Sequence, residues 1–127
     1  MSTIKFAKVL IKLLDTKEIQ DKIKKRIYPL VAPLNTLYPY VVFQRIDSGQ
    51  YTKDNRYQDD ITYNIIVAND DYDKGLDIAE MIVSELDGKR NILIDDYKIA
   101  SIKLTNTSED YNDAYLQNLT FEFRINL

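Results

Sequence analysis

The chain changes character at Arg26-Ile27-Tyr28-Pro29-Leu30-Val31-Ala32-Pro33 and, after a short spacer, continues as Tyr38-Pro39-Tyr40-Val41-Val42-Phe43-Gln44-Arg45-Ile46. Each proline holds φ near about −65°, removes a backbone donor and biases the residue before it towards extended conformations. No helix can therefore run from Tyr28 to Tyr40. We expect extended backbone in this region, helices that end before it, and a first long strand at Tyr40 to Asp47 after it.

Two short amphipathic helices are predicted before this boundary. In the first, apolar residues recur at helical spacing with lysines mostly between them. These residues are Ile4, Phe6, Val9, Leu10, Leu13 and Leu14. In the second, Thr16 is a candidate N-cap and Ile19 and Ile23 form an i, i+4 pair.

A basic cluster follows the second helix and consists of Lys22, Lys24, Lys25 and Arg26. We interpret it as a helix C-terminus, where the helix dipole favours cations. A phosphate-binding patch is the alternative, but no glycine-rich loop accompanies these charges.

After the boundary the pattern predicts strands and one longer helix. Besides Tyr40 to Asp47, the predicted strands are Ile61 to Ala68, Tyr97 to Thr105 and Tyr115 to Leu127. The last of these alternates most regularly between apolar and polar residues, which indicates one buried face and one solvated face. The helix is predicted from about Asp73 to Asp87, with Gly88 just after its end.

The predicted fold class is α+β. The order helix, helix, strand, strand, helix, strand, strand contains two hairpin-like pairs, so we expect an antiparallel or mixed four-stranded sheet with helices packed on one face. The chain has 127 residues, 45% of them hydrophobic, and residues 1–127 are expected to form a single domain. No apolar run approaches the roughly 18 residues of a membrane helix, and the absence of cysteine excludes disulfides.

The stretch from Ser48 to Asp60 contains no apolar aliphatic residue, and Asp47-Ser48-Gly49 at its start is typical of a turn. We predict a long exposed hairpin arm there. The chain also has ten tyrosines and no tryptophan, and several tyrosines lie outside the predicted core. Tyrosines on loops combine a large contact area with a hydrogen-bonding hydroxyl, which is typical of protein interfaces.

The candidate interface combines residues of this arm with tyrosines near the predicted loop from Ser108 to Ala114. Its members are Gln50, Tyr51, Lys53, Asp54, Arg56, Tyr57, Tyr111 and Tyr115. Tyrosines interleaved with Lys53 and Arg56 could instead stack nucleic-acid bases. The net charge of −3 and the neighbouring aspartates disfavour that alternative, so we prefer a protein partner.

Catalytic chemistry is poorly supported, because the chain has no histidine and no cysteine. Carboxylate pairs remain that could share a metal or act as acid and base if the fold brought two of them together. They are Asp59-Asp60, Asp70-Asp71, Asp95-Asp96 and Glu109-Asp110. Each pair lies at a predicted turn or element end, so we interpret them as capping and turn residues and expect no catalytic residue, metal or cofactor.

One of these regions partly matches a calcium-loop template. Asn69, Asp71, Asp73 and Glu80 occupy positions 1, 3, 5 and 12 of that template. Position 6 requires glycine but is Lys74, and the segment before the loop is predicted as a strand. A helix cap at Asp71 or Asp73 is therefore the preferred interpretation.

Taken together, these segments resemble a family of small tail-completion proteins from long-tailed phages and prophages. The resemblance covers nearly the whole chain. Its parts are the N-terminal helix pair, the Arg26-Ile27-Tyr28-Pro29 and Ala32-Pro33 segment, the Pro39 to Arg45 strand, the polar loop, the strand followed by the Leu76 to Leu86 helix, and the closing strand pair.

The resemblance implies a tail-terminator-like fold and a tail terminator or head-to-tail joining function. Such a protein forms a ring, expected to be a hexamer, at the head-proximal end of the tail tube, and both closure before assembly and closure on the tube remain open. The implied partners are further copies of the chain, the tail-tube protein and the head–tail connector, while DNA passes without specific binding. The implied location is the virion tail, and the host cytoplasm during assembly.

Two other classes of function remain open from the residues alone. A non-phage α+β domain with a ligand-binding or regulatory role would need a concave apolar pocket with a few converging polar groups. A small metal-dependent nuclease, which we favour less, would need the acidic pairs to converge in space.

Overall fold

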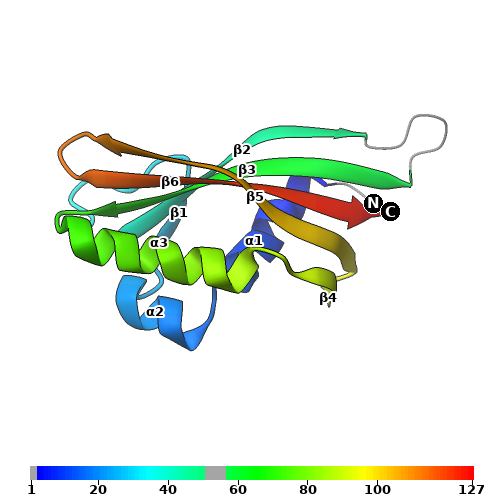
Figure 1. The fold of residues 1–127 in the computed structure, drawn as a ribbon, viewed down its shortest axis with the longest axis horizontal. Helices are drawn as coiled ribbons and strands as arrows, with labels where there is room; N and C mark the ends of the chain where they lie inside the picture. The colour runs from blue at the N-terminus through cyan, green and yellow to red at the C-terminus, as the bar shows by residue number, and fades with distance from the viewer. Residues whose placement is uncertain (1–2, 51–56) are drawn as a thin grey trace.

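The computed structural model describes residues 3–50 and 57–127, and Figure 1 shows their arrangement. In chain order the elements are η1 (Ile4–Phe6), α1 (Ala7–Leu13), α2 (Lys17–Ile23), β1 (Ile27–Pro29), β2 (Tyr40–Gln50), β3 (Gln58–Asn69), α3 (Tyr72–Leu86), β4 (Arg90–Ile94), β5 (Tyr97–Tyr111) and β6 (Tyr115–Asn126). The boundary around the prolines contains no helix, as its sequence predicts. Its one regular element is the short strand β1.

The strands form one six-stranded sheet in the order β1-β2-β3-β6-β5-β4. β1 pairs with β2 in parallel and every other neighbouring pair is antiparallel, so the sheet is mixed. The predicted four-stranded sheet is therefore wrong, although the α+β class stands. The two missed strands, β1 and β4, are the edges of the sheet and are its shortest strands.

β1 and β4 have little hydrophobic periodicity, which explains why the sequence does not reveal them. β1 has three residues and ends at Pro29. β4 has no fully buried residue and forms a hairpin with β5 through Asp95 and Asp96, whose φ values are 48° and 68°. Two successive positive φ values are typical of a type I′ hairpin turn. Short edge strands are held by backbone hydrogen bonds to a neighbour, and the sequence pattern does not encode that neighbour.

The strands β2, β3 and β5 are longer than predicted, because polar residues at their ends continue the backbone pairing with the neighbouring strand. β2 continues to Gln50, and its segment from Ser48 to Gln50 pairs with the segment from Asp59 to Ile61 of β3. The described flanks of the predicted arm are thus part of the sheet. β5 likewise continues past Thr105 to Tyr111, which leaves a short turn in place of the predicted loop from Ser108 to Ala114.

The second N-terminal helix, α2, follows the predicted capping pattern, whereas η1 and α1 have no side-chain cap. The Thr16 side chain accepts a hydrogen bond from the backbone of Ile19 (3.3 Å) at the start of α2. α2 ends at Ile23, and the left-handed Lys24 and Lys25 follow with φ of 51° and 61°. The basic cluster therefore surrounds a helix C-terminus, as predicted.

α3 begins one residue before its predicted start, because Asp71 caps it. The Asp71 carboxylate accepts a hydrogen bond from the backbone of Lys74 (3.0 Å) and lies at the positive end of the helix dipole. The helix ends at Leu86, and Gly88 follows with φ of 83°, a conformation that favours glycine.

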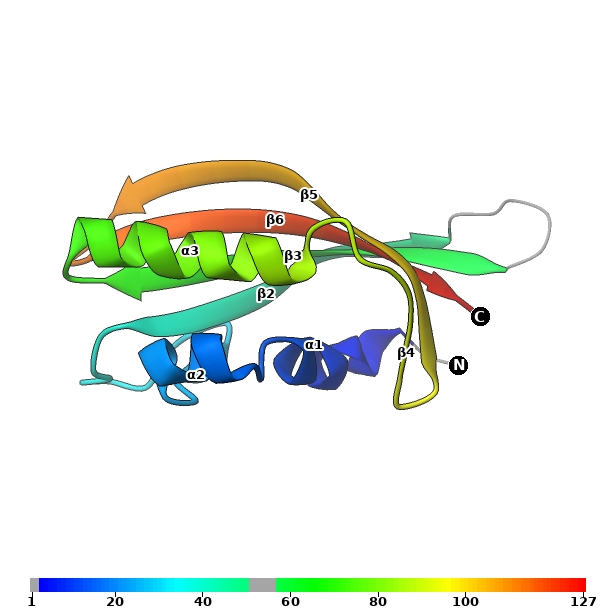
Figure 2. The ribbon, with the colours of Figure 1, turned by 60° about the horizontal axis from the view of Figure 1, so that its bottom comes forward.

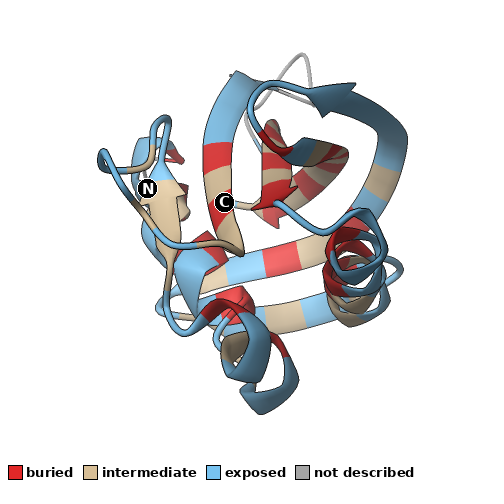
Figure 3. Cartoon of the chain, turned by 90° about the vertical axis from the view of Figure 1, so that its left-hand side faces the viewer, coloured by how far each residue is buried: buried red, intermediate tan, exposed pale blue. Residues whose placement is uncertain are grey.

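The helices cover one face of the sheet and form the core with it, as Figure 2 shows from the side. Along β3 and β6 every second side chain points into this core, and Figure 3 shows the resulting banding of buried and partly buried residues on the curled sheet. The largest buried side chains on the strands are Tyr63, Phe121 and Phe123. Phe6 of η1 packs against the sheet. Its ring centroid lies 5.1 Å from that of Phe123 and 5.6 Å from that of Tyr97.

Candidate protein interface

The structure divides the predicted interface residues between the two ends of the sheet. Gln50 ends β2 opposite Asp59, and Tyr57 lies just before β3, where its carbonyl accepts a hydrogen bond from the backbone of Leu127 (2.8 Å). Tyr111 and Tyr115 pair across the β5–β6 turn at the other end. The remaining predicted members, Tyr51, Lys53, Asp54 and Arg56, lie outside the described residues.

A tyrosine cluster occupies the β5–β6 end of the sheet. The rings of Tyr111 and Tyr115 have centroids 5.2 Å apart, and Tyr72 from the start of α3 lies 5.4 Å from Tyr115. The side chains of Tyr111 and Tyr115 are 63% and 40% exposed, so they remain available for contact. Edge-to-face rings in an exposed position are typical of sites that bind another protein.

Glu109 connects Tyr72 of the cluster to the β5–β6 hairpin. Its sequence context predicted it only as a member of an acidic pair. Its carboxylate accepts hydrogen bonds from the Tyr72 hydroxyl (2.5 Å) and from the Gln117 amide (2.7 Å). Glu109 and Gln117 are direct partners in the β5–β6 ladder. A hairpin register centred on the Asn112-to-Ala114 turn would place them opposite each other, and that is the sequence signal that could have found the pair.

The same hydrogen bonds set the pH response of the cluster. Donation by Tyr72, and secondarily by Gln117, lowers the pKa of Glu109 below its ordinary value of 4.5. The hydrogen bond to Glu109 is also the main reason that the pKa of Tyr72 is raised above 10.0. Both groups are exposed to solvent, so the effect on overall stability is small.

We predict a local, two-sided pH dependence of this cluster. Because the folded pKa of Glu109 is depressed, its contribution to the stability of the cluster is complete above pH 4.5 and disappears as the pH falls through the folded pKa. Because the folded pKa of Tyr72 is raised, its contribution to the stability of the cluster is complete below pH 10.0 and disappears as the pH rises through the folded pKa. NMR titration of both side chains measures these shifts.

The matched variant for this titration is Glu109→Gln, which keeps the shape of the side chain and removes its charge. In that variant the Tyr72 pKa is expected to return towards its ordinary value. A Tyr72 pKa that is the same in both proteins would show that the two side chains do not interact in solution.

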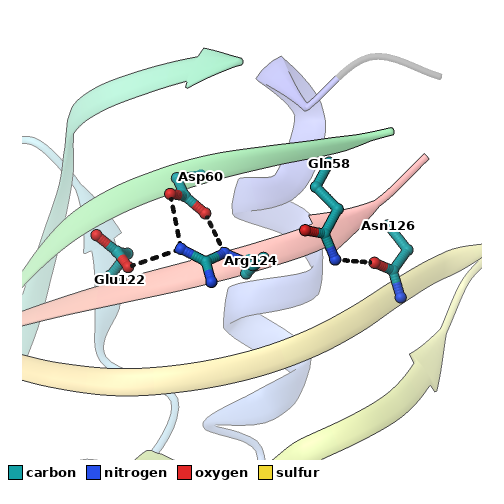
Figure 4. Close-up of polar contacts among 5 residues, drawn as sticks. All are labelled: Gln58, Asp60, Glu122, Arg124 and Asn126. Carbon is teal, nitrogen blue, oxygen red and sulfur yellow. Dashed lines mark hydrogen bonds and ion pairs between the residues drawn. The ribbon is translucent and has the colours of Figure 1, made fainter. Parts of the chain in front are cut away.

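The sheet face opposite the helices carries a charged cluster near the other end, shown in Figure 4. Arg124 of β6 donates to both carboxylate oxygens of Asp60 on β3, at 2.9 and 3.2 Å, and lies 3.9 Å from Glu122. Beside it, the Gln58 amide donates to Asn126 at 2.6 Å. These cross-strand pairs fasten β3 to β6 on the exposed face.

This arrangement corrects the interpretation of Asp59 and Asp60 as turn residues. Both lie within β3, and the alternation of the strand sends their side chains to opposite faces. Asp60 reaches Arg124 on the outer face, whereas Asp59 is fully buried and accepts a hydrogen bond from the Thr3 hydroxyl (3.4 Å). The polar composition of the arm conceals this difference because only strand register determines which side chain faces inward.

The other acidic pairs lie apart from one another. Asp71 caps α3, Asp95 and Asp96 form the β4–β5 turn, and Glu109 joins the tyrosine cluster. Within residues 3–50 and 57–127 no three acidic side chains come together as a possible metal site. The calcium-loop residue Asn69 instead accepts a hydrogen bond from the backbone of Asp71 (3.4 Å) in the turn before the helix.

An exposed apolar segment, which the sequence analysis did not select, follows β1. Leu30, Val31, Leu34 and Leu37 are between 65% and 92% exposed. The loop borders a surface cavity of about 730 Å³ that is also lined by the outer-face residues Ile66 and Leu116. Exposed aliphatic residues grouped in this way are typical of protein contact surfaces. No helix in the described part of the chain is long and apolar enough to span a membrane.

The fold defines a class of small α+β proteins with a mixed sheet that is covered by helices on one side. The chain belongs to the tail completion protein gp17 family, whose model matches residues 7–126. It is therefore a phage tail structural protein, which agrees with the resemblance seen in the sequence. No curated protein sequence matches the chain.

Solved structures of other proteins share this fold. One, described as the virion of a native gene transfer agent particle, aligns with a TM-score of 0.77 and 14% identity, covering 91% of this chain and 90% of that chain. A second solved chain aligns with a TM-score of 0.70 and 8% identity, covering 100% of this chain and 97% of that chain. At such identities the likeness establishes the fold alone.

Proposed function

We propose that this chain terminates the tail tube of a long-tailed phage and joins it to the head connector, as one subunit of a ring. The observation that carries the proposal is the tail completion family match over residues 7–126. Residues 1–127 act as one domain in this role. The expected ring is a hexamer, which the free chain need not form in solution.

Ring assembly requires contacts that differ on the two sides of each subunit. The tyrosine cluster with Tyr111 and Tyr115 lies at one end of the sheet, and Tyr57 and the described flanks of the arm lie at the other. This separation supports a role in which the two ends of a subunit contact different partners. The partners are thus further copies of the chain, the tail-tube protein and the connector protein.

The proposed location is the virion tail, with assembly in the host cytoplasm. The gene transfer agent virion that contains a chain of the same fold supports this location. The net charge of −3 supports a ring through which DNA passes without being held, because capture of phosphates requires basic residues. With neither histidine nor cysteine in the chain, the proposed role is structural and not enzymatic.

Complementation of a phage or prophage that lacks this gene tests the function. Without the protein we expect heads and tails that do not join, and the wild-type chain should restore tailed, infectious particles. Tyr51→Ala and Arg56→Ala should fold normally, since surface substitutions usually change stability by about 0.5 kcal/mol or less, yet reduce joining if the arm is a contact element.

Ser84→Ala on an exposed position of α3 is the matched control and should complement fully. Electron microscopy of the lysates and co-sedimentation of the purified chain with tail tubes provide the readouts. Normal particles from the deletion strain would disprove the proposed function. Arm variants that complement normally would restrict the interface to other surfaces and leave the function intact.

A further inference from the structure

The edge strands of the sheet leave two long segments without an outer strand partner. The first of them, residues 44–50, makes side-chain contacts with the N-terminal segment, where Arg45 donates to the Ile4 carbonyl (3.2 Å) and the hydroxyls of Thr3 and Ser48 share a hydrogen bond (3.2 Å). β1 pairs only with Val41 to Phe43 of β2, and β4 pairs only with Tyr97 to Ser101 of β5. Beyond the pairing with β4, residues 87–89 contact the outer edge of β5 as far as Leu104, whose backbone N–H donates to the Asp87 carboxylate (2.9 Å). Among the described residues, no backbone hydrogen bond joins the outer edge of residues 44–50 or 105–111 to another strand.

These uncovered segments lack proline and lysine, two of the features that usually protect a sheet edge, although a β-bulge lies between Arg45 and Asp47 and another between Leu104 and Asn106. An unpaired edge is a template for another strand, and proteins commonly block it with proline, lysine or a very short strand. β1 is short and ends at Pro29, and β4 is short and follows Lys89. Residues 44–50 and 105–111, which have equal lengths, contain neither proline nor lysine.

We propose that copies of this chain associate through their sheet edges, with residues 44–50 of one copy pairing with residues 105–111 of the next. The inference rests on the proposed ring and identifies its subunit contact. The two segments lie on opposite edges of the sheet, so each copy can bind one neighbour through β2 and another through β5. Such a contact is heterologous, and it propagates until rotation closes a ring.

The strand directions suit this contact. β2 is antiparallel to β3, β3 to β6 and β6 to β5, so β2 and β5 run antiparallel within one sheet. Repeating the sheet side by side therefore gives an antiparallel pair between copies and keeps the helix-covered faces on the same side. The uncovered half of β2 is level with the start of β5, and that of β5 is level with the start of β2, so the neighbour must be shifted along the strands.

Charge selects this pairing over the alternatives. Arg45 lies opposite Tyr63, and Glu109 lies opposite Gln117, which places both charges on the helix-covered face of their edges. An antiparallel register with Arg45 opposite Glu109 joins opposite charges and keeps Asp47 away from the acidic end of β5. Pairing β5 with a second β5 would instead bring Glu109 and Asp110 of two copies together, which like-charge repulsion disfavours.

Engineered cysteines test the contact directly, because the chain has none of its own. The variant Asp47→Cys combined with Ser108→Cys places both thiols on the outer face, because these positions pair with the outer-face residues Thr62 and Asn118. Treated with a short thiol crosslinker in the presence of tail tubes, it is expected to give a ladder of covalent multimers. Each single variant should give no multimer. A dimer from a single variant would show like-edge pairing and overturn the proposal, as would the absence of any ladder from the double variant.

Lysine substitutions provide a second test that does not depend on the register. Gln44→Lys and Ser108→Lys introduce an edge-protecting charge at exposed positions on the outer face, whereas Ser84→Lys makes the same change on α3. We expect the two edge variants to keep the wild-type melting temperature and to lose at least about tenfold in assembly on tubes, a change of about 1.4 kcal/mol in contact free energy. Ser84→Lys should assemble normally.

Complementation separates this proposal from the proposed function. If both edge variants fold, assemble and complete tails as the wild type does, the edge contact is wrong while the tail function stands. If the wild-type chain restores no tails but the double-cysteine variant still gives a ladder in solution, the self-association is correct and the tail function is wrong.

Discussion

Replacing Phe123 with alanine is expected to lower the free energy of unfolding by about 3–5 kcal/mol. The side chain is fully buried in the middle of β6, and its ring centroid lies 5.1 Å from Phe6, 6.1 Å from Tyr63 and 6.3 Å from Phe121. Removing it leaves a cavity between the sheet and the N-terminal segment that two layers of rigid aromatic rings cannot easily fill. This loss is a large part of the 5–15 kcal/mol, roughly, that stabilises a typical domain.

Chemical denaturation followed by circular dichroism measures this effect, with Glu122→Ala as the control. Glu122 is the neighbour of Phe123 on the outer face of the same strand, and its change should cost about 0.5 kcal/mol or less. A decrease of less than about 1 kcal/mol in the free energy of unfolding of Phe123→Ala would mean that the neighbouring side chains collapse into the cavity. That result would contradict tight packing around Phe123.

The second large effect is expected for Phe6→Ala, again about 3–5 kcal/mol. Phe6 is fully buried and is the only aromatic residue that η1 inserts into the sheet, where it also meets Tyr97 at 5.6 Å. Without this anchor η1 and α1 should detach earlier than the sheet unfolds. Hydrogen exchange should then show faster exchange in α1 than in β6.

Ile4→Ala is the matched control in the same element, since Ile4 is 66% exposed and its truncation should change stability by about 0.5 kcal/mol or less. Because Phe6 and Phe123 are in contact, their double variant should be less destabilised than the sum of the single variants, by about 0.5–3 kcal/mol. Strict additivity would mean that the two rings do not share one cavity.

These stability variants also matter for interpreting the assembly experiments. Phe6 and Phe123 lie in the core, whereas Tyr111 and Ser108 are exposed on β5. Loss of tail joining in a core variant therefore reports unfolding, while the same loss in a folded edge variant reports a missing contact. Melting curves must accompany every complementation result for this reason.

The sequence by itself determined the features that depend on neighbouring residues along the chain. Proline geometry excluded a helix from Tyr28 to Tyr40. Side-chain capping placed the start of α2 at Thr16 and limited the cap of α3 to Asp71 or Asp73, of which Asp71 is the cap. The alternation of β6 identified its buried face, including Phe123. These are local effects, so a single sequence contains the information for them.

Only the tertiary structure decided which strands lie beside one another and where their polar side chains point. The edge strands β1 and β4, the Asp60–Arg124 pair and the contact between Tyr72 and Glu109 all depend on register between segments far apart in the chain. A shift of one residue in a strand exchanges its two faces, and backbone pairing accepts almost any side chain. Composition therefore identified the surface as polar and tyrosine-rich, while the sheet register determined which of its residues meet and which edges stay open.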